Sequence, residues 1–247
     1  MGGSSPSNPT FWWGNFLLFD DAPSAGEGDR WERLFDDAFA GQSEVTHRTF
    51  AWDRTDGAAG EADREFVARG YELERTTGLI ATPSEIRPHQ RASGTADVRV
   101  LHPGADEPFW EQVIAVQMAQ AAGEHEDAAY HETFLRRRQA SLRELFRADR
   151  GAWYVALLDD EVVGSLGIVV TGARARFQTV DTAEARRGQG VASRLVVEAA
   201  RHTAAHHRIR HFVIAADPDY HAIGIYESVG FKPREHVVGA MLKPTGR

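Results

Sequence analysis

The stretch RFQTVDTAEARRGQGVASRLVV, residues 176–197, decides the fold. Its first part, Phe177 to Thr182, has the character of a strand, and the residues after Gly190 continue as a helix. The basic turn between them contains two glycines, which permit a tight bend and a close approach of a ligand to the backbone. The first turn of a helix has unpaired N–H groups and a partial positive charge. This stretch is therefore predicted to bind an anionic phosphate group.

We compared this turn with the sequence patterns of three kinds of phosphate-binding loop. The mononucleotide loop ends in Gly-Lys-Ser/Thr, and the chain contains neither Lys-Ser nor Lys-Thr. The dinucleotide fingerprint has a third glycine where this chain has Ser193. The third pattern, Arg/Gln-x-x-Gly-x-Gly/Ala, is satisfied by Arg187, Gly190 and Ala192. In this respect the turn resembles the acyl-CoA loop of the GNAT N-acetyltransferase superfamily.

A second segment, DPDYHAIGIYESVGF (residues 217–231), is similar to a helix and strand of the same superfamily. The similarity is carried by Ala222, Ile225, Tyr226, Gly230 and Phe231, which follow the loop in the required order and at the required distance. The resemblance covers residues 97–247. It implies an α/β fold with a mixed, twisted sheet of the GNAT type.

The first part of the chain contains a weak internal repeat of the second. Residues 65–81 align with residues 225–241 without gaps, so that Gly70 meets Gly230. The first copy has the acidic APSAGEGD where the second has ARRGQGVA, and Phe66 stands opposite Tyr226. Unless these are two unrelated α/β segments, the first copy is a degenerate GNAT-like half-domain that is not catalytic.

The expected organisation follows from these segments. Residues 1–10, rich in Ser, Gly and Pro, are predicted to be disordered. The degenerate lobe is expected at 11–94, and the catalytic domain at 95–247, because a proline- and glycine-containing connector ends near residue 94.

Composition narrows the classes of function. The net charge is −8, and residues 1–95 hold 16 acidic against 9 basic side chains, so no broad basic surface for nucleic acid is expected. The absence of cysteine excludes disulfides, thiolate metal sites and a cysteine nucleophile. No apolar run approaches the length of a membrane span, and the N-terminus is not a signal peptide. We expect a cytoplasmic protein, a monomer or homodimer, without membrane partners.

The resemblance implies acetyl-CoA as co-substrate and no metal. It places the residues that hold acetyl-CoA at the end of the strand and along the loop: Val180, Thr182, Arg187, Gly188, Gln189, Gly190, Val191 and Ala192. A backbone N–H near Asp181 or Thr182 is expected to stabilise the oxyanion that forms during acyl transfer.

The implied reaction moves an acetyl group to a primary amine by direct attack in a ternary complex, since no cysteine exists to carry the acyl group. Tyr226 matches the position of the family's general acid, which protonates the leaving thiolate. Asp181 is our catalytic candidate for the base, and Glu124, His125, Asp219 or a water chain stay open. The alternative function is an acyl-CoA-binding sensor or regulatory module without turnover.

Two questions stay open at this level. The acceptor is a small molecule or a peptide, and a polyamine, an aminoglycoside, an amino acid or a protein N-terminus all fit, as do several acyl lengths. His202 and His206 have the i, i+4 spacing of metal ligands, but no acidic partner motif accompanies them, so we expect a solvated helix end.

Overall fold

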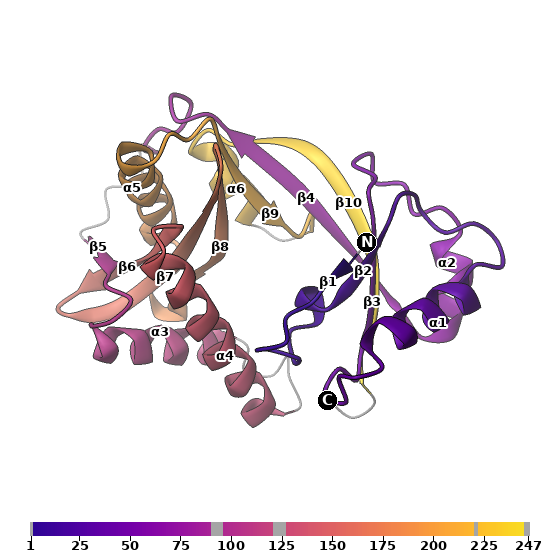
Figure 1. Cartoon of the computed structure of the whole chain (residues 1–247). Helices are drawn as coiled ribbons and strands as arrows, with labels where there is room; N and C mark the ends of the chain where they lie inside the picture. The colour runs from indigo at the N-terminus through magenta and orange to yellow at the C-terminus, as the bar shows by residue number, and fades with distance from the viewer. Residues whose placement is uncertain (1, 90–95, 121–126, 220–221, 245–247) are drawn as a thin grey trace. The chain divides into compact units, whose positions relative to one another are not determined.

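The computed structural model describes residues 2–89, 96–120, 127–219 and 222–244 (Figure 1). The chain forms two compact units that do not follow the order of the sequence. Unit 1 consists of Met1–Thr77 and Glu235–Arg247, and unit 2 consists of Gly78–Arg234. Each unit combines strands with helices, in agreement with the predicted mixed α/β fold.

Unit 1 is built on the strands β2 and β3, which are parallel, and on β10, which pairs antiparallel with β3. Its core is aromatic, because Trp31, Phe35 and Phe39 repeat every four residues along α1 and so share one helical face. They pack with Phe50 and Trp52 of β3. In chain order the elements are β1 (Gly2–Gly3), η1 (Trp12–Gly14), β2 (Phe16–Phe19), α1 (Gly28–Phe39), β3 (Arg48–Trp52), α2 (Ala62–Glu65) and η2 (Val67–Arg69). The strands β4 (Glu72–Ala81) and β10 (Lys232–Leu242) each run through both units, with residues 72–77 and 235–242 in unit 1.

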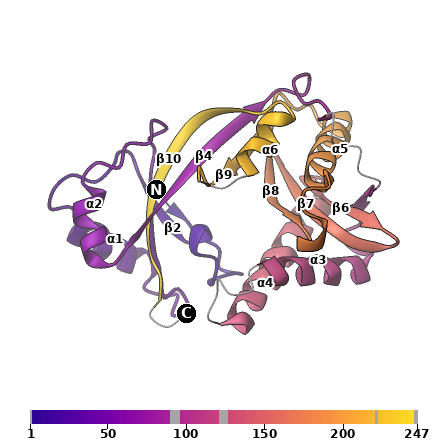
Figure 2. The ribbon, with the colours of Figure 1, turned by 180° about the vertical axis from the view of Figure 1, so that it is seen from behind.

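Unit 2 contains an antiparallel run β5-β6-β7-β8 and a parallel pair β8-β9. Helices α3 and α4 lie on one face of β6–β8 and α5 on the other (Figure 2). Leu195 of α5 and Trp110 of α3 are each fully buried against their own face. Its elements are β5 (Asp97–Leu101), α3 (Glu107–Gln120), α4 (Ala128–Arg147), β6 (Gly151–Leu158), β7 (Glu161–Thr171), β8 (Arg174–Thr182), η3 (Glu184–Arg186), α5 (Val191–His206), β9 (His211–Ala216) and α6 (Ala222–Ser228).

The order of the strands shows an exchange between the two halves of the chain. The sheet has the order β1-β2-β3-β10-β4-β9-β8-β7-β6-β5. The last strand of the chain, β10, therefore lies beside β3, and the last strand of the first half, β4, lies beside β9. Each half of the chain thus places its final strand beside the second-to-last strand of the other half.

The internal repeat reappears in the backbone. The series β2-α1-β3-α2-β4 has the same order as β8-α5-β9-α6-β10, and both β2-β3 and β8-β9 are parallel pairs. Gly70 and Gly230 both have positive φ after a helical turn. In each copy the residue after this glycine donates its N–H to a carbonyl five residues earlier in the chain. Tyr71 donates to Phe66 at 3.0 Å, and Phe231 donates to Tyr226 at 3.1 Å.

The structure differs from the expected organisation in two places. The compact units divide at Thr77 and not near residue 94, because the exchange of final strands carries β10 into unit 1. Residues 2–10, expected to be disordered, contain buried Asn8 and Thr10, which hydrogen bond with each other at 2.6 Å. In the described part of the chain, no helix is both long enough and apolar enough to cross a membrane.

Candidate functional site

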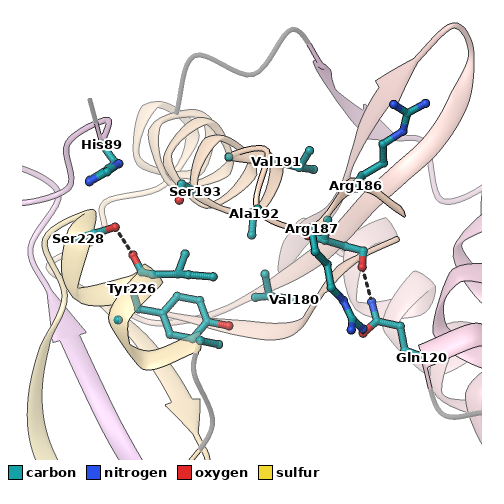
Figure 3. Close-up of a pocket in the computed structure, with 16 residues that line it drawn as sticks. His89, Gln120, Val180, Arg186, Arg187, Val191, Ala192, Ser193, Tyr226 and Ser228 are labelled. Carbon is teal, nitrogen blue, oxygen red and sulfur yellow. Dashed lines mark hydrogen bonds between the residues drawn. The ribbon is translucent and has the colours of Figure 1, made fainter. Parts of the chain in front are cut away.

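A cavity of about 490 Å³ opens in unit 2 around the N-terminus of α5 (Figure 3). Its walls come from the end of β8, the loop that follows, α5, α6 and the end of α3, which brings together segments far apart in the sequence. The lining residues are His89, Gln120, Val180, Thr182, Arg186, Arg187, Gly188, Gly190, Val191, Ala192, Ser193, Ala222, Gly224, Ile225, Tyr226 and Ser228.

The loop before α5 is shaped by glycine. Gly188 and Gly190 have φ of +74° and +79°, a region that L side chains rarely adopt. A Cβ on Gly188 would meet nothing within 4 Å, so the space beside this backbone is open. Gly190 precedes the 16-residue helix α5, and no side chain caps that helix. The uncapped N–H groups and Arg186 and Arg187 beside them suit an anion.

Gln120, at the end of α3, ties the loop to β8. Its Oε1 accepts a hydrogen bond from Arg187 Nη2 at 3.1 Å, and its Nε2 donates one to the carbonyl of Thr182 at 2.9 Å (Figure 3). Thr182 Oγ1 is buried and has no hydrogen-bond partner in the described chain, although the residue lines the cavity. An orphaned buried hydroxyl is costly unless a ligand or water bonds to it. The cavity therefore presents both charged and neutral polar groups that fit the phosphate and amide groups of acetyl-CoA.

Tyr226 reaches the cavity from α6. Its side chain is 7 % exposed, and in Figure 3 the hydroxyl end of the ring lies toward Val180 of β8. The helix that carries it ends at Ser228, and a Cβ on Gly230 in the following turn would lie 2.1 Å from the carbonyl oxygen of Glu85. Only glycine fits that contact, so the turn after α6 is fixed in the position that presents Tyr226.

A β-bulge decides which way Asp181 faces. Ser165 and Gly167 of β7, which share a face because they are two residues apart, pair with Asp181 and Gln178 of β8. Those two β8 residues are three apart, because the register shifts by one residue at Thr179. Asp181 therefore lies on the same face as Gln178. That face is covered by α3 and α4, and Asp181 does not line the cavity.

Asp181 is buried in this position. Its Oδ2 accepts a hydrogen bond from Nε2 of Gln117 on α3 at 3.1 Å. Burial raises the pKa of Asp181 to about 6, against the hydrogen bond from Gln117 and the charges of Arg138 and Arg187, which lower it. A carboxylate with a pKa near neutrality is suited to accept and release protons.

Most residues predicted to bind the co-substrate come together at the cavity. Val180, Thr182, Arg187, Gly188, Gly190, Val191, Ala192 and the predicted acid Tyr226 all line it. Gln189 does not, because its Nε2 donates back to the carbonyl of Ala185 at 3.1 Å. Of the other candidate bases, Asp219 is exposed, and Glu124 and His125 lie outside the described residues.

Sequence reasoning missed Gln120, His89 and Ser193 as lining residues. Ser193 follows the loop within one helical turn and could have been read from the motif. Gln120 lies 67 residues before Arg187, and no local pattern marks it.

In unit 1 the loop that aligns with the one before α5, residues 22–29, is occupied by a side chain of the protein, Glu65. Glu65 accepts hydrogen bonds from the N–H of Gly26 at 2.6 Å through Oε1 and from the N–H of Gly28 at 3.3 Å through Oε2, at the start of α1. A Cβ on Gly28 would lie 2.7 Å from Nε of Arg69, so this side is covered as well. Glu65 aligns with Ile225, which lines the cavity in unit 2. An internal carboxylate thus occupies the N–H groups that an anionic ligand would need.

The histidines at the end of α5 lie in a separate cavity of about 320 Å³. The rings of His202 and His206 are stacked with centroids 4.1 Å apart, and His206 Nδ1 bonds to the carbonyl of His202 at 2.7 Å. His202 also meets the hydroxyl of Tyr154 at 3.1 Å. Across the described residues, no three His, Asp or Glu side chains are grouped to hold a metal ion.

The comparisons with known proteins agree with this geometry. Residues 111–231 match the model of the acetyltransferase (GNAT) family. No curated protein matches the chain in sequence.

Solved structures share the fold at low identity. A functionally unknown conserved protein from Staphylococcus epidermidis has a TM-score of 0.73 at 14 % identity, covering 98 % of this chain and 89 % of that one. A GCN5-related N-acetyltransferase from Kribbella flavida has a TM-score of 0.60 at 16 % identity, covering 94 % and 83 %. A tandem GNAT protein from the clavulanic acid biosynthesis pathway has a TM-score of 0.58 at 15 % identity, covering 92 % and 77 %.

Proposed function

We propose that the chain, whose residues 111–231 match the model of the acetyltransferase (GNAT) family, transfers an acetyl group from acetyl-CoA to a primary amine. The observation that carries the proposal is the uncapped N-terminus of α5, which opens into a cavity beside Arg187 and faces Tyr226. A structural turn would have no need of an open, charged cavity at this place.

The loop and helix would hold the co-substrate. Gly188, Gly190, Val191 and Ala192, together with Arg187, line the space where the pyrophosphate would lie, so that backbone N–H groups and a guanidinium could bind it. To reach it, Arg187 exchanges its hydrogen bond to the neutral Gln120 for one to an anion, which is the stronger bond. Val180 and Thr182, at the end of β8, would border the pantetheine arm.

Two proton transfers complete the reaction. When bound, acetyl-CoA supplies a thioester whose carbonyl carbon forms a C–N bond with the amine as the C–S bond breaks. Asp181 accepts the proton that the nitrogen loses, directly or through water, because a pKa of about 6 leaves it ionised at neutral pH, and it then releases that proton to solvent. Tyr226 donates a proton to the departing sulfur and is reprotonated from solvent. The products are an N-acetylated amine and CoA with its thiol protonated.

The direct test is the release of free CoA thiol from acetyl-CoA in the presence of a library of primary amines. The proposal predicts release that depends on at least one amine and on the enzyme. Tight binding of acetyl-CoA without release by any amine would contradict it and would favour a sensor.

A further inference from the structure

The face of β8 that carries Asp181 also carries Arg176. Val169 and Gly167 of β7, which share a face, pair with Arg176 and Gln178 of β8. The bulge at Thr179 adds Asp181 to the same face. Arg176, Gln178 and Asp181 therefore form a row below α3 and α4.

Arg138 of α4 projects onto this row. Its Nη2 donates a hydrogen bond to Oε1 of Gln178 at 3.3 Å. Arg138 is also close enough to Arg176 and Asp181 for both charges to act on it: burial chiefly lowers the pKa of Arg138, Arg176 lowers it further, and Asp181 raises it. One carboxylate thus lies near two guanidinium groups.

Two further side chains of this region, Arg176 and Ser165, bear on what could bind there. Across the described residues, no carboxylate pairs with Arg176, which is exposed. Ser165 is fully buried directly opposite Asp181, and its Oγ has no hydrogen-bond partner there. A buried polar atom without a partner beside a charged row indicates a place where a polar ligand or water completes the bonding.

From this row we propose that the acceptor is an amine that also carries an acidic group, and that Arg138 and Arg176 bind that group while the amine lies at Asp181. This inference rests on the proposed acetyl transfer. Guanidinium groups bind carboxylate and phosphate with paired hydrogen bonds. A polyamine or an aminoglycoside carries several positive charges, and two arginines beside the base would repel it.

Matched pairs of amines test the inference. L-phenylalanine is compared with phenethylamine, L-lysine with cadaverine, and phosphoethanolamine with ethanolamine; spermidine and sisomicin represent the polycations. The readout is thiol release at saturating acetyl-CoA. In at least one pair, the acidic member should have a kcat/KM higher by about 10- to 100-fold, the range expected for a charged hydrogen bond. The pair that responds distinguishes a carboxylate from a phosphate.

Variants locate the effect. Arg176→Gln and Arg138→Gln should remove most of that preference, by raising KM for the acidic amine much more than for its uncharged partner. The control is Arg201→Gln, on α5 at the opposite face and paired with Glu198, which should keep the preference. Circular dichroism and thermal melting of each variant establish that it is folded.

The inference is overturned if neutral or polycationic amines react as well as the acidic ones, or if acetyl-CoA binds and no acidic amine reacts. It is also overturned if the preference survives both arginine substitutions. Failure of the proposed transfer is distinguishable, because then no amine of either class releases thiol. As a readout without turnover, an N-acetylated form of the preferred acidic amine should raise the melting temperature in the presence of CoA, and less so in Arg176→Gln.

Discussion

The carboxylate of Asp181 accepts a hydrogen bond from Gln117 at 3.1 Å and lies on the face of β8 opposite to the one that alternation from Gln178 would give it. The bulge at Thr179 produces this orientation. It separates the proposed base, under α3 and α4, from the residues that line the co-substrate cavity. The two reactants would therefore approach the end of β8 from its two sides.

Replacing Asp181 by Asn should stabilise the protein and sharply lower turnover. Burial raises the pKa of Asp181 from 3.8, the ordinary value of an exposed Asp, to about 6 in the folded state, so the folded protein binds this proton more tightly. The ionised group consequently destabilises the fold above pH 6, by at most about 3 kcal/mol, and this cost fades as the pH falls from 6 to 4. Urea unfolding at pH 7.5 should show a higher free energy of unfolding for Asp181→Asn.

Two comparisons make that prediction specific. The increase in the free energy of unfolding caused by Asp181→Asn should be smaller at pH 4. The control Asp97→Asn, an exposed substitution at the start of β5, should cause no increase at either pH. A loss of stability in Asp181→Asn at pH 7.5 would show that the carboxylate is satisfied in the fold and is not held at a cost.

The pH dependence of kcat/KM should report the same group. A base must be unprotonated in the free enzyme, so kcat/KM should rise with pH through about 6 and then level off or rise again with the acceptor's own ionisation. The measurement is thiol release with a single acceptor between pH 5 and 9. If the limb near pH 6 persists unchanged in the residual activity of Asp181→Asn, another group is the base.

Removing the hydroxyl of Tyr226 separates binding from chemistry. Tyr226→Phe keeps the ring that packs at the end of α6 and removes only the proposed proton donor. We expect kcat to fall by about 10²- to 10⁴-fold and the Kd of acetyl-CoA to stay within about twofold. Single-turnover kinetics and calorimetry measure the two quantities. An unchanged kcat would assign Tyr226 to packing alone.

Unit 1 should not bind acetyl-CoA, because Glu65 occupies the N–H groups of Gly26 and Gly28. Glu65→Ala leaves these groups to water and also removes the charge beside Arg69. Its free energy of unfolding should fall by about 1–2 kcal/mol, with acetyl-CoA affinity unchanged. Asp63→Ala, an exposed change in the same helix, serves as the control. Weaker acetyl-CoA binding in Glu65→Ala would contradict this assignment.

Local signals in the sequence predicted the parts of the site that are local in the chain. The place of Arg187, Gly190 and Ala192 in the site could be predicted because a strand, a glycine turn and a helix follow one another directly in the chain. The aligned glycines Gly70 and Gly230 likewise predicted the repeat, and both end a helical turn with positive φ.

What the sequence could not predict depends on long-range pairing. The orientation of Asp181 follows from a one-residue register shift against β7, which alternation along β8 alone does not reveal. The strand exchange was hidden because nothing in the sequences of β4 and β10 decides which of them lies beside β3 and which beside β9. Gln120 joins Thr182 and Arg187 across more than sixty residues, for which a single sequence carries no signal.

The central claim is that the loop before α5 holds acetyl-CoA, and isothermal titration calorimetry tests it most directly. The wild type is compared with a double variant, Arg187→Glu with Gly190→Asp, and with a control of the same charge change, Arg174→Glu with Gly172→Asp. Gly172 has positive φ like Gly190, and a Cβ there would meet nothing within 4 Å, but it lies in the turn before β8, away from the cavity. We predict one site per chain in the wild type and the control, and no binding by the loop variant. No binding by the wild type, or equal binding by the loop variant, would contradict the account.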